Sequence, residues 1–144
     1  MRSNFTLFSA PAAMLASALV GACAAHAPTE NPLANSEWQF VKIDHEAPAE
    51  PDKAALSFTA ENLSATVGCN GMGGHWRIAN GRLIAGPLLG TEMYCAGPIW
   101  RQEQAIGSLL VAAPEIEFEN DLLIIRSSGH KAILKRVNRL QSGS

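Results

Sequence analysis

The sequence has little charge and few aromatic side chains. Charged residues make up 17% and aromatic residues 6% of the 144 positions, against 47% hydrophobic residues. This balance differs from that of disordered chains, which combine low hydrophobicity with high net charge. The basic residues are scattered, and a concentrated basic surface for nucleic acid is lacking. We therefore expect one small folded domain without a nucleic-acid partner.

Motifs for cofactors and catalysis are also missing. There is no Cys-x-x-Cys or His-x-x-x-His spacing to indicate a metal site. The glycine-rich segment 68–74 is not followed by Lys-Ser or Lys-Thr, as a phosphate-binding loop would be. Cys69 with His75 as nucleophile and base, and Glu92 with Glu103 as a carboxylate pair, are weaker interpretations than structural roles. We therefore expect no metal, no cofactor and no enzymatic activity.

The N-terminal residues have the pattern of a secretory signal. Arg2 is the only charged residue before Glu30, and an apolar, alanine-rich run follows it. The run ends in the sequence of residues 19–23, Leu-Val-Gly-Ala-Cys, which resembles the lipobox of bacterial lipoproteins. The resemblance implies cleavage before Cys23 and acylation of that cysteine, and several acyl chains on one residue anchor a protein stably.

These features predict a location at the bacterial cell envelope. We expect a signal peptide at residues 1–22, followed by the lipid attachment at Cys23 and a flexible tether within residues 23–35. Ala24 stands where an aspartate would retain an enterobacterial lipoprotein, so the resemblance favours the periplasmic face of the outer membrane. Ordinary cleavage at an Ala-x-Ala site, giving a soluble periplasmic or secreted protein, is the alternative.

The other two cysteines suggest a disulfide. If lipid occupies Cys23, then Cys69 and Cys95 remain as a possible pair in an oxidising compartment. Their bond would close a loop of about 27 residues and stabilise the fold by about 3.5 kcal/mol on the chain-entropy estimate. Two free buried thiols are the alternative, because the sequence does not show whether the Cα atoms are close enough.

Periodicity and turn residues predict short strands and one helix. The strands are expected at 36–44, 55–59, 63–69, 75–78, 82–89, 116–118, 122–125 and 132–137. Alternation in 63–69 places Cys69 toward the core, and the glycines of 68–74 crowd the turn that follows. Gly97-Pro98 opens the helix, and Glu103 lies on its apolar stripe. The fold class is therefore α+β, with a curved, mostly antiparallel β-sheet packed on a single amphipathic helix.

A set of motifs resembles the META domain of HslJ-like bacterial lipoproteins. These motifs are Trp38 and Phe58 in the first two strands, Gly68-Cys69-Asn70, Gly74 with Trp76, Thr91-x-Met93-x-Cys95, and Glu103 in the helix. We expect this domain at residues 36–138, followed by a disordered tail at 139–144. The resemblance implies a compact sheet-and-helix domain, supports the pairing of Cys69 with Cys95, and implies an envelope or stress-associated role without general enzymatic activity.

Two functions are compatible with these expectations. The first is a noncatalytic envelope module that binds a protein or helps to maintain the envelope under stress. The second is a binder of a small apolar ligand or lipid in a cleft between sheet and helix. A core filled by Trp38, Phe58, Trp76 and Phe118 would favour the first. In either case, Glu103 is expected to accept hydrogen bonds from a loop, because a buried charge needs partners.

Overall fold

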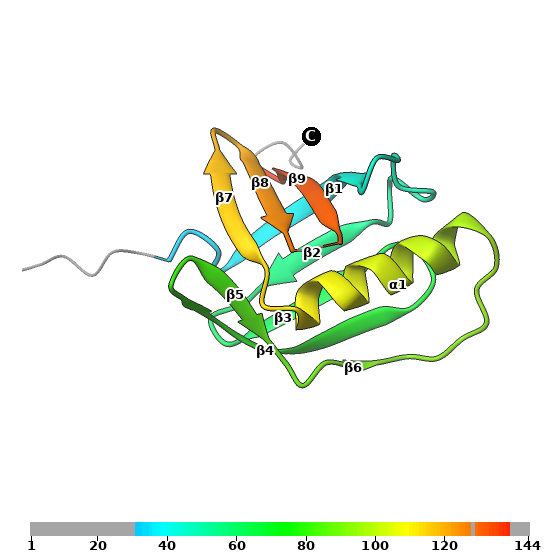
Figure 1. Cartoon of the computed structure of the whole chain (residues 1–144), viewed down its shortest axis with the longest axis horizontal. Coiled ribbons are helices and arrows are strands. Elements are labelled where there is room, and N and C mark those ends of the chain that lie inside the picture. Colours follow the sequence, from blue (N-terminus) through cyan, green and yellow to red (C-terminus); the bar gives the residue numbers. More distant parts are fainter. Residues whose placement is uncertain (1–30, 128, 139–144) are drawn as a thin grey trace, which may run out of the picture.

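The chain folds into a closed β-barrel with one helix (Figure 1). The computed structural model describes residues 31–127 and 129–138. The predicted signal peptide, Cys23 and the predicted tail at 139–144 lie outside these residues. In the described part of the chain, no helix has the length and apolar character needed to cross a bilayer.

All strand pairings in the described residues are antiparallel. The strands are β1 (Ser36–Ile43), β2 (Ala55–Phe58), β3 (Asn62–Thr66), β4 (Gly71–Ala79), β5 (Arg82–Ala85), β6 (Leu89–Gly90), β7 (Glu115–Glu119), β8 (Leu122–Arg126) and β9 (Lys131–Arg136). The helix α1 spans Pro98–Val111 and begins at the proline that the sequence predicts. Most of these elements agree with the predicted ones, including the hairpin turn at Asn80-Gly81, where both residues have positive φ. The strand predicted at 82–89 ends at Ala85, and the short β6 was not predicted.

The fold is a barrel and not the predicted curved sheet, because the sheet closes on itself. The strand order is β3-β2-β1-β9-β8-β7-β5-β4, and β3 also pairs with β4, while β6 adds to the outer side of β4. Closure gives each barrel strand two neighbours and removes the exposed edges of an open sheet. The antiparallel pairing, the predominance of strands and the single helix of the described residues agree with the prediction.

The glycine-rich segment is a strand and not the predicted turn. Gly71, Gly73 and Gly74 begin β4, and the connection from β3 is confined to residues 67–70. A Cβ atom at Gly73 would lie 2.9 Å from the Leu63 carbonyl oxygen of the neighbouring strand. Glycine therefore permits the close approach of β3 and β4 that closes the barrel.

The helix fills one end of the barrel and a short N-terminal segment fills the other. Ile106, Leu109 and Leu110 of α1 are buried in the core, and the Gln102 side chain bonds to Ala47 and Ala49 in the loop that follows β1. At the end where β1 begins, Leu33 has no exposed surface and belongs to the same core. The final residues of the predicted flexible tether are thus part of the folded domain.

Three of the four aromatic residues whose burial would favour a noncatalytic module are buried in the core. Trp38, Phe58 and Trp76 are 1%, 3% and 8% exposed, whereas Phe118 is 38% exposed. The Phe118 ring lies 6.0 Å from that of Trp38, and the guanidinium of Arg136 lies 4.9 Å from the Trp38 ring centroid. Phe118 therefore lies beside Trp38 with more than a third of its surface exposed, so three of these four aromatic residues fill the core.

Truncating Leu33 tests whether the domain begins before Ser36. We expect Leu33→Ala to lower the free energy of unfolding by about 2–4 kcal/mol, because it removes a fully buried side chain. Urea unfolding of the mature protein measures this loss. Val111→Ala, at a 63% exposed position, is the control and should change stability by less than about 0.5 kcal/mol. Equal stability of the two variants would show that residues 31–35 contribute nothing to the fold.

Candidate functional site

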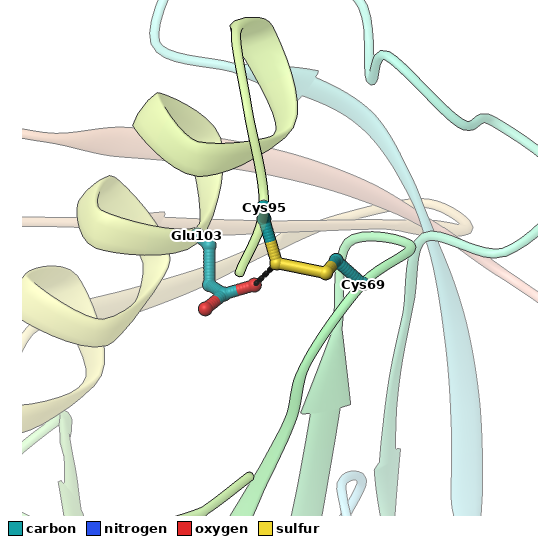
Figure 2. A group of neighbouring side chains, drawn as sticks. All are labelled: Cys69, Cys95 and Glu103. Atoms are coloured by element: carbon teal, nitrogen blue, oxygen red, sulfur yellow. Dashed lines mark hydrogen bonds between the residues drawn. A yellow bond between two sulfur atoms is a disulfide. The ribbon is translucent and has the colours of Figure 1, made fainter. Parts of the chain in front are cut away.

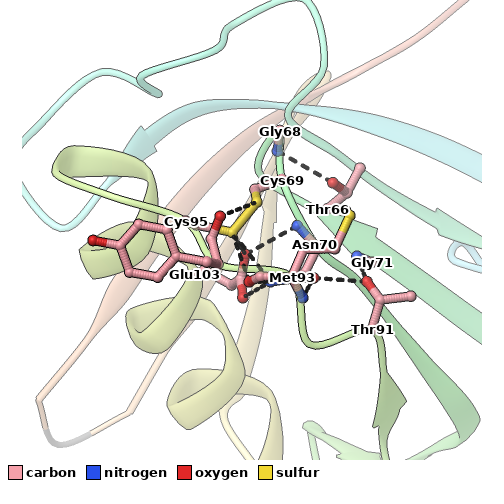
Figure 3. The surroundings of a disulfide bond; sticks show 10 residues. Thr66, Gly68, Cys69, Asn70, Gly71, Thr91, Met93, Cys95 and Glu103 are labelled. Carbon is pink, nitrogen blue, oxygen red and sulfur yellow. Dashed lines mark hydrogen bonds between the residues drawn. A yellow bond between two sulfur atoms is a disulfide. The ribbon is translucent and has the colours of Figure 1, made fainter.

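Asn70 is the centre of a buried polar cluster that joins three parts of the chain (Figure 3). It lies in the β3–β4 connection and is 3% exposed. Its backbone N–H donates to Oε2 of Glu103 at 3.1 Å, and its side-chain Nδ2 donates to Oε1 at 2.9 Å. Glu103, on α1, is 7% exposed. The predicted role of Glu103 as an acceptor of loop hydrogen bonds is confirmed.

The Asn70 amide also binds the segment that leads into α1. Its Oδ1 accepts from the Thr91 hydroxyl and from the Met93 backbone N–H, both at 2.8 Å. Its Nδ2 donates to the Met93 carbonyl at 3.0 Å. Thr91 Oγ1 in turn accepts from the Gly71 N–H at 3.2 Å. Asn70 therefore uses both its donor and acceptor capacity, and Thr91 and Met93 serve the cluster through a hydroxyl and backbone groups.

A disulfide between Cys69 and Cys95 joins the same two segments covalently (Figure 2). The Cα atoms are 6.3 Å apart, within the usual range for such a bond. The structure thus has the predicted disulfide and not the alternative of two free thiols. Cys95 is buried, but Cys69 is only partly buried. The predicted core-facing position of Cys69 is wrong, because β3 ends at Thr66 and Gly68 adopts φ 125°, which breaks the alternation.

The disulfide also limits what the sulfur atoms can do chemically. Cys69, Cys95 and Glu103 offer three possible metal-ligand atoms within 4.8 Å of one another. A thiolate is the form that binds metals and acts as a nucleophile, and neither sulfur is a thiolate in the disulfide. The dashed line from Cys95 to Glu103 in Figure 2 is a 3.8 Å contact. It is not a hydrogen bond, because a disulfide sulfur carries no proton.

Two glycines predicted as motif residues allow neighbouring segments of the chain to pack closely against them. The positive φ of Gly68 favours glycine, and a Cβ atom there would lie 2.7 Å from Cβ of Glu50. At Gly74, a Cβ atom would lie 2.4 Å from the carbonyl oxygen of Pro87. Gly68 thus shapes the connection that presents Asn70, and Gly74 packs β4 against the loop that follows β5.

The two chemical pairs that the sequence analysis disfavoured have other surroundings here. Glu92 is exposed, whereas Glu103 is buried and already bound to Asn70, although both residues line one groove. His75 lies in β4 opposite Asn62 and is exposed. Because Cys69 is bonded to Cys95, the nucleophile of the imagined Cys69–His75 pair is absent. Sequence reasoning missed a different pair, Asp44 and His130, whose Oδ2 and Nδ1 lie 3.1 Å apart across 86 residues.

Three exposed apolar side chains, two of them aromatic, lie next to the buried cluster. Met93, Tyr94 and Trp100 are 57%, 93% and 47% exposed. Two open grooves, of about 520 and 370 Å³, share Tyr94 and Trp100 as lining residues. Sequence reasoning missed this surface, because Trp100 carried no motif meaning and Tyr94 lies between two motif residues. Its only sequence signal is the pair Met93-Tyr94, which lies outside the predicted strands and helix.

Comparison with known proteins identifies similarities of family and fold. The family model described as META domain matches residues 31–139. A solved NMR structure of a protein from Burkholderia xenovorans is 20% identical, with a TM-score of 0.61, over 74% of this chain and 85% of that one. A second NMR structure is also 20% identical, with a TM-score of 0.63, over 72% and 90%. At this identity the likeness shows the fold alone. No curated protein matches the chain.

The buried amide can be tested by an isosteric change. Asn70→Asp replaces the donor Nδ2 by an oxygen that faces the Glu103 carboxylate and the Met93 carbonyl. We expect a loss of about 3–5 kcal/mol in the free energy of unfolding, as for an uncompensated buried charge, measured by urea denaturation at neutral pH. Asn62→Asp, at an exposed position in β3, should lose less than about 0.5 kcal/mol. An equally small loss of unfolding free energy in both variants would show that the Asn70 amide does not stabilise the fold.

The disulfide and its contribution to stability can be tested separately from the hydrogen bonds of the cluster. In protein purified from an oxidising compartment, mass spectrometry of non-reduced peptides should find Cys69 joined to Cys95. The double variant Cys69→Ala/Cys95→Ala should lose about 3.5 kcal/mol of unfolding free energy. Recovery of both residues as free thiols would contradict the pairing.

Proposed function

Because the chain belongs to the META domain family, we propose that it is a noncatalytic, lipid-anchored envelope protein that binds another protein. In this proposal the barrel is a rigid module that contributes to maintenance of the envelope, including under stress. The lipid on Cys23 holds it at the periplasmic face of the outer membrane. Residues between Cys23 and the start of the fold act as the tether.

One observation carries the protein-binding proposal. Asn70 and Glu103, the buried polar residues of the cluster, bind each other and the backbone of neighbouring segments. Both amide groups of the Asn70 side chain and both carboxylate oxygens of Glu103 take part in these hydrogen bonds, and the nearby sulfurs form a disulfide. An active site needs polar groups that are free to bind reacting atoms. The geometry therefore supports a structural role for the Asn70–Glu103 cluster, in which it holds the neighbouring surface in place for a partner.

The alternative, an apolar ligand between sheet and helix, has less support. The inward side chains Ile106, Leu109 and Leu110 of α1 are each 1% exposed and pack in one core with Leu83 and Trp38. The space in which such a ligand would lie is occupied by these side chains. The grooves beside Tyr94 and Trp100 are open to solvent and lie at the surface. Binding at a surface fits a protein partner better than an enclosed lipid.

Acylation of Cys23 tests the anchoring part of the proposal. Cells that express the full chain should incorporate radiolabelled palmitate into it, and Cys23→Ser should reduce the label to background. Cys69→Ala is the matched control and should keep full labelling, because this cysteine lies inside the folded domain. Equal labelling of Cys23→Ser and the unchanged protein would overturn the anchor, and so would absence of label from both.

A further inference from the structure

We propose that the aromatic face, defined as Met93, Tyr94 and Trp100 with Glu92, docks a partner-protein segment that presents a lysine or arginine beside an apolar side chain. This inference rests on the proposed function, since it assumes that the domain binds a protein, and it adds where the partner binds and what chemistry it presents.

The exposure of the aromatic face is the first argument. Tyr94 is 93% exposed, and Met93 and Trp100 are each about half exposed. Single exposed apolar residues are common, whereas neighbouring ones around a groove are typical of interaction sites. Tyrosine, tryptophan and methionine are also the residues enriched at the centres of protein interfaces. Tyr94 and Trp100 line both of the open grooves on this face.

The rigidity of the supporting backbone is the second argument. Both backbone polar groups of Met93 bind the Asn70 side chain. Thr91, two residues earlier, is held by its hydroxyl, and Cys95, two residues later, is held by the disulfide. These constraints hold a segment whose Met93 and Tyr94 side chains stay outside the core. A preorganised surface loses less conformational entropy on binding, so the cluster gives the aromatic face a fixed shape at low cost.

Charge identifies the kind of partner. The larger groove is lined by Glu92 and Glu103, and neither groove is lined by a lysine or arginine. Glu92 is exposed and forms no ion pair among the described residues. The faces of tyrosine and tryptophan rings attract cations. A segment with one basic and one apolar side chain therefore matches both the acidic and the aromatic parts of the face.

The position of the aromatic face in the domain favours a protein over the anchoring membrane. In Figure 1, the described chain begins at the left of the view, whereas the segment leading into α1 lies at the right, at the other end of the long axis. The chain from Cys23 to residue 31 can span at most about 29 Å. The segment that leads into α1 therefore lies at the end of the domain far from the point where the chain from Cys23 enters the fold. The acidic charge of Glu92 also repels anionic lipid surfaces.

Photo-crosslinking in intact cells tests the inference in the full lipid-anchored protein. Benzoylphenylalanine replaces Tyr94 in one strain and, as controls, Val111 or Phe118 in two others. These control positions are 63% and 38% exposed and lie at the end of α1 and in β7. We expect a dominant protein adduct from position 94, at least about fivefold stronger than from either control. Mass spectrometry of the adduct should place the crosslink within two residues of a lysine or arginine and an apolar side chain.

Charge reversal tests the partner chemistry in the same assay. Glu92→Lys should reduce the adduct from position 94 by at least about fivefold, because it opposes a basic partner. Glu119→Lys, also exposed but in β7, should leave the adduct unchanged. Thermal unfolding of both variants should match that of the unchanged protein, which separates loss of docking from loss of fold.

The remaining outcomes distinguish the two proposals. A specific protein adduct from position 111 or 118 but not 94 would overturn the docking role of the aromatic face. It would leave the proposed protein-binding function standing. An adduct of position 94 with phospholipid, or with a segment lacking a basic residue, would overturn the partner chemistry. Absence of protein adducts from all three positions would overturn both proposals. An adduct from position 94 that is insensitive to Glu92→Lys would overturn the role of charge.

Discussion

The buried carboxylate of Glu103 is the constraint on which the surrounding structure depends. A charge removed from water is costly unless hydrogen bonds replace its solvation. Here the donors come from Asn70, one from its backbone and one from its side chain. The position of α1 is therefore coupled to the β3–β4 connection. Because the same Asn70 amide also binds Met93, one residue determines how the helix, the barrel and the segment between them meet.

The disulfide and the barrel add to this coupling in different ways. The bond between Cys69 and Cys95 lowers the conformational entropy of the unfolded chain. The hydrogen bonds, in contrast, favour one arrangement of the folded chain. Closure of the barrel by β3 and β4 gives the connection between them a rigid base. Leu33 and α1 fill the two ends. The interior is consequently a packed core, and the residues available for binding lie on the outer surface.

Much of the fold could be predicted because local chemistry is strong in particular places. Asn80-Gly81 favours a tight hairpin, and Gly97-Pro98 favours a helix start, whatever lies elsewhere in the chain. The burial of Glu103 could also be predicted from its place on the apolar stripe. The closed barrel could not be predicted, because it depends on the pairing of β5 with β7 and of β1 with β9. These strands are distant in sequence, and alternation does not reveal which strands become neighbours.

The sequence by itself determined most of the strands, the helix, the family resemblance and the cysteines that are able to pair. These features depend on periodicity, on turn residues and on motifs that are contiguous in the chain. Only the tertiary structure decided that Asn70 is buried while Cys69 is only partly buried, because the positive φ of Gly68 breaks the alternation between them and β3. It also decided that Tyr94 and Trp100 lie exposed around shared grooves, since exposure depends on what packs against a side chain and not on the side chain alone.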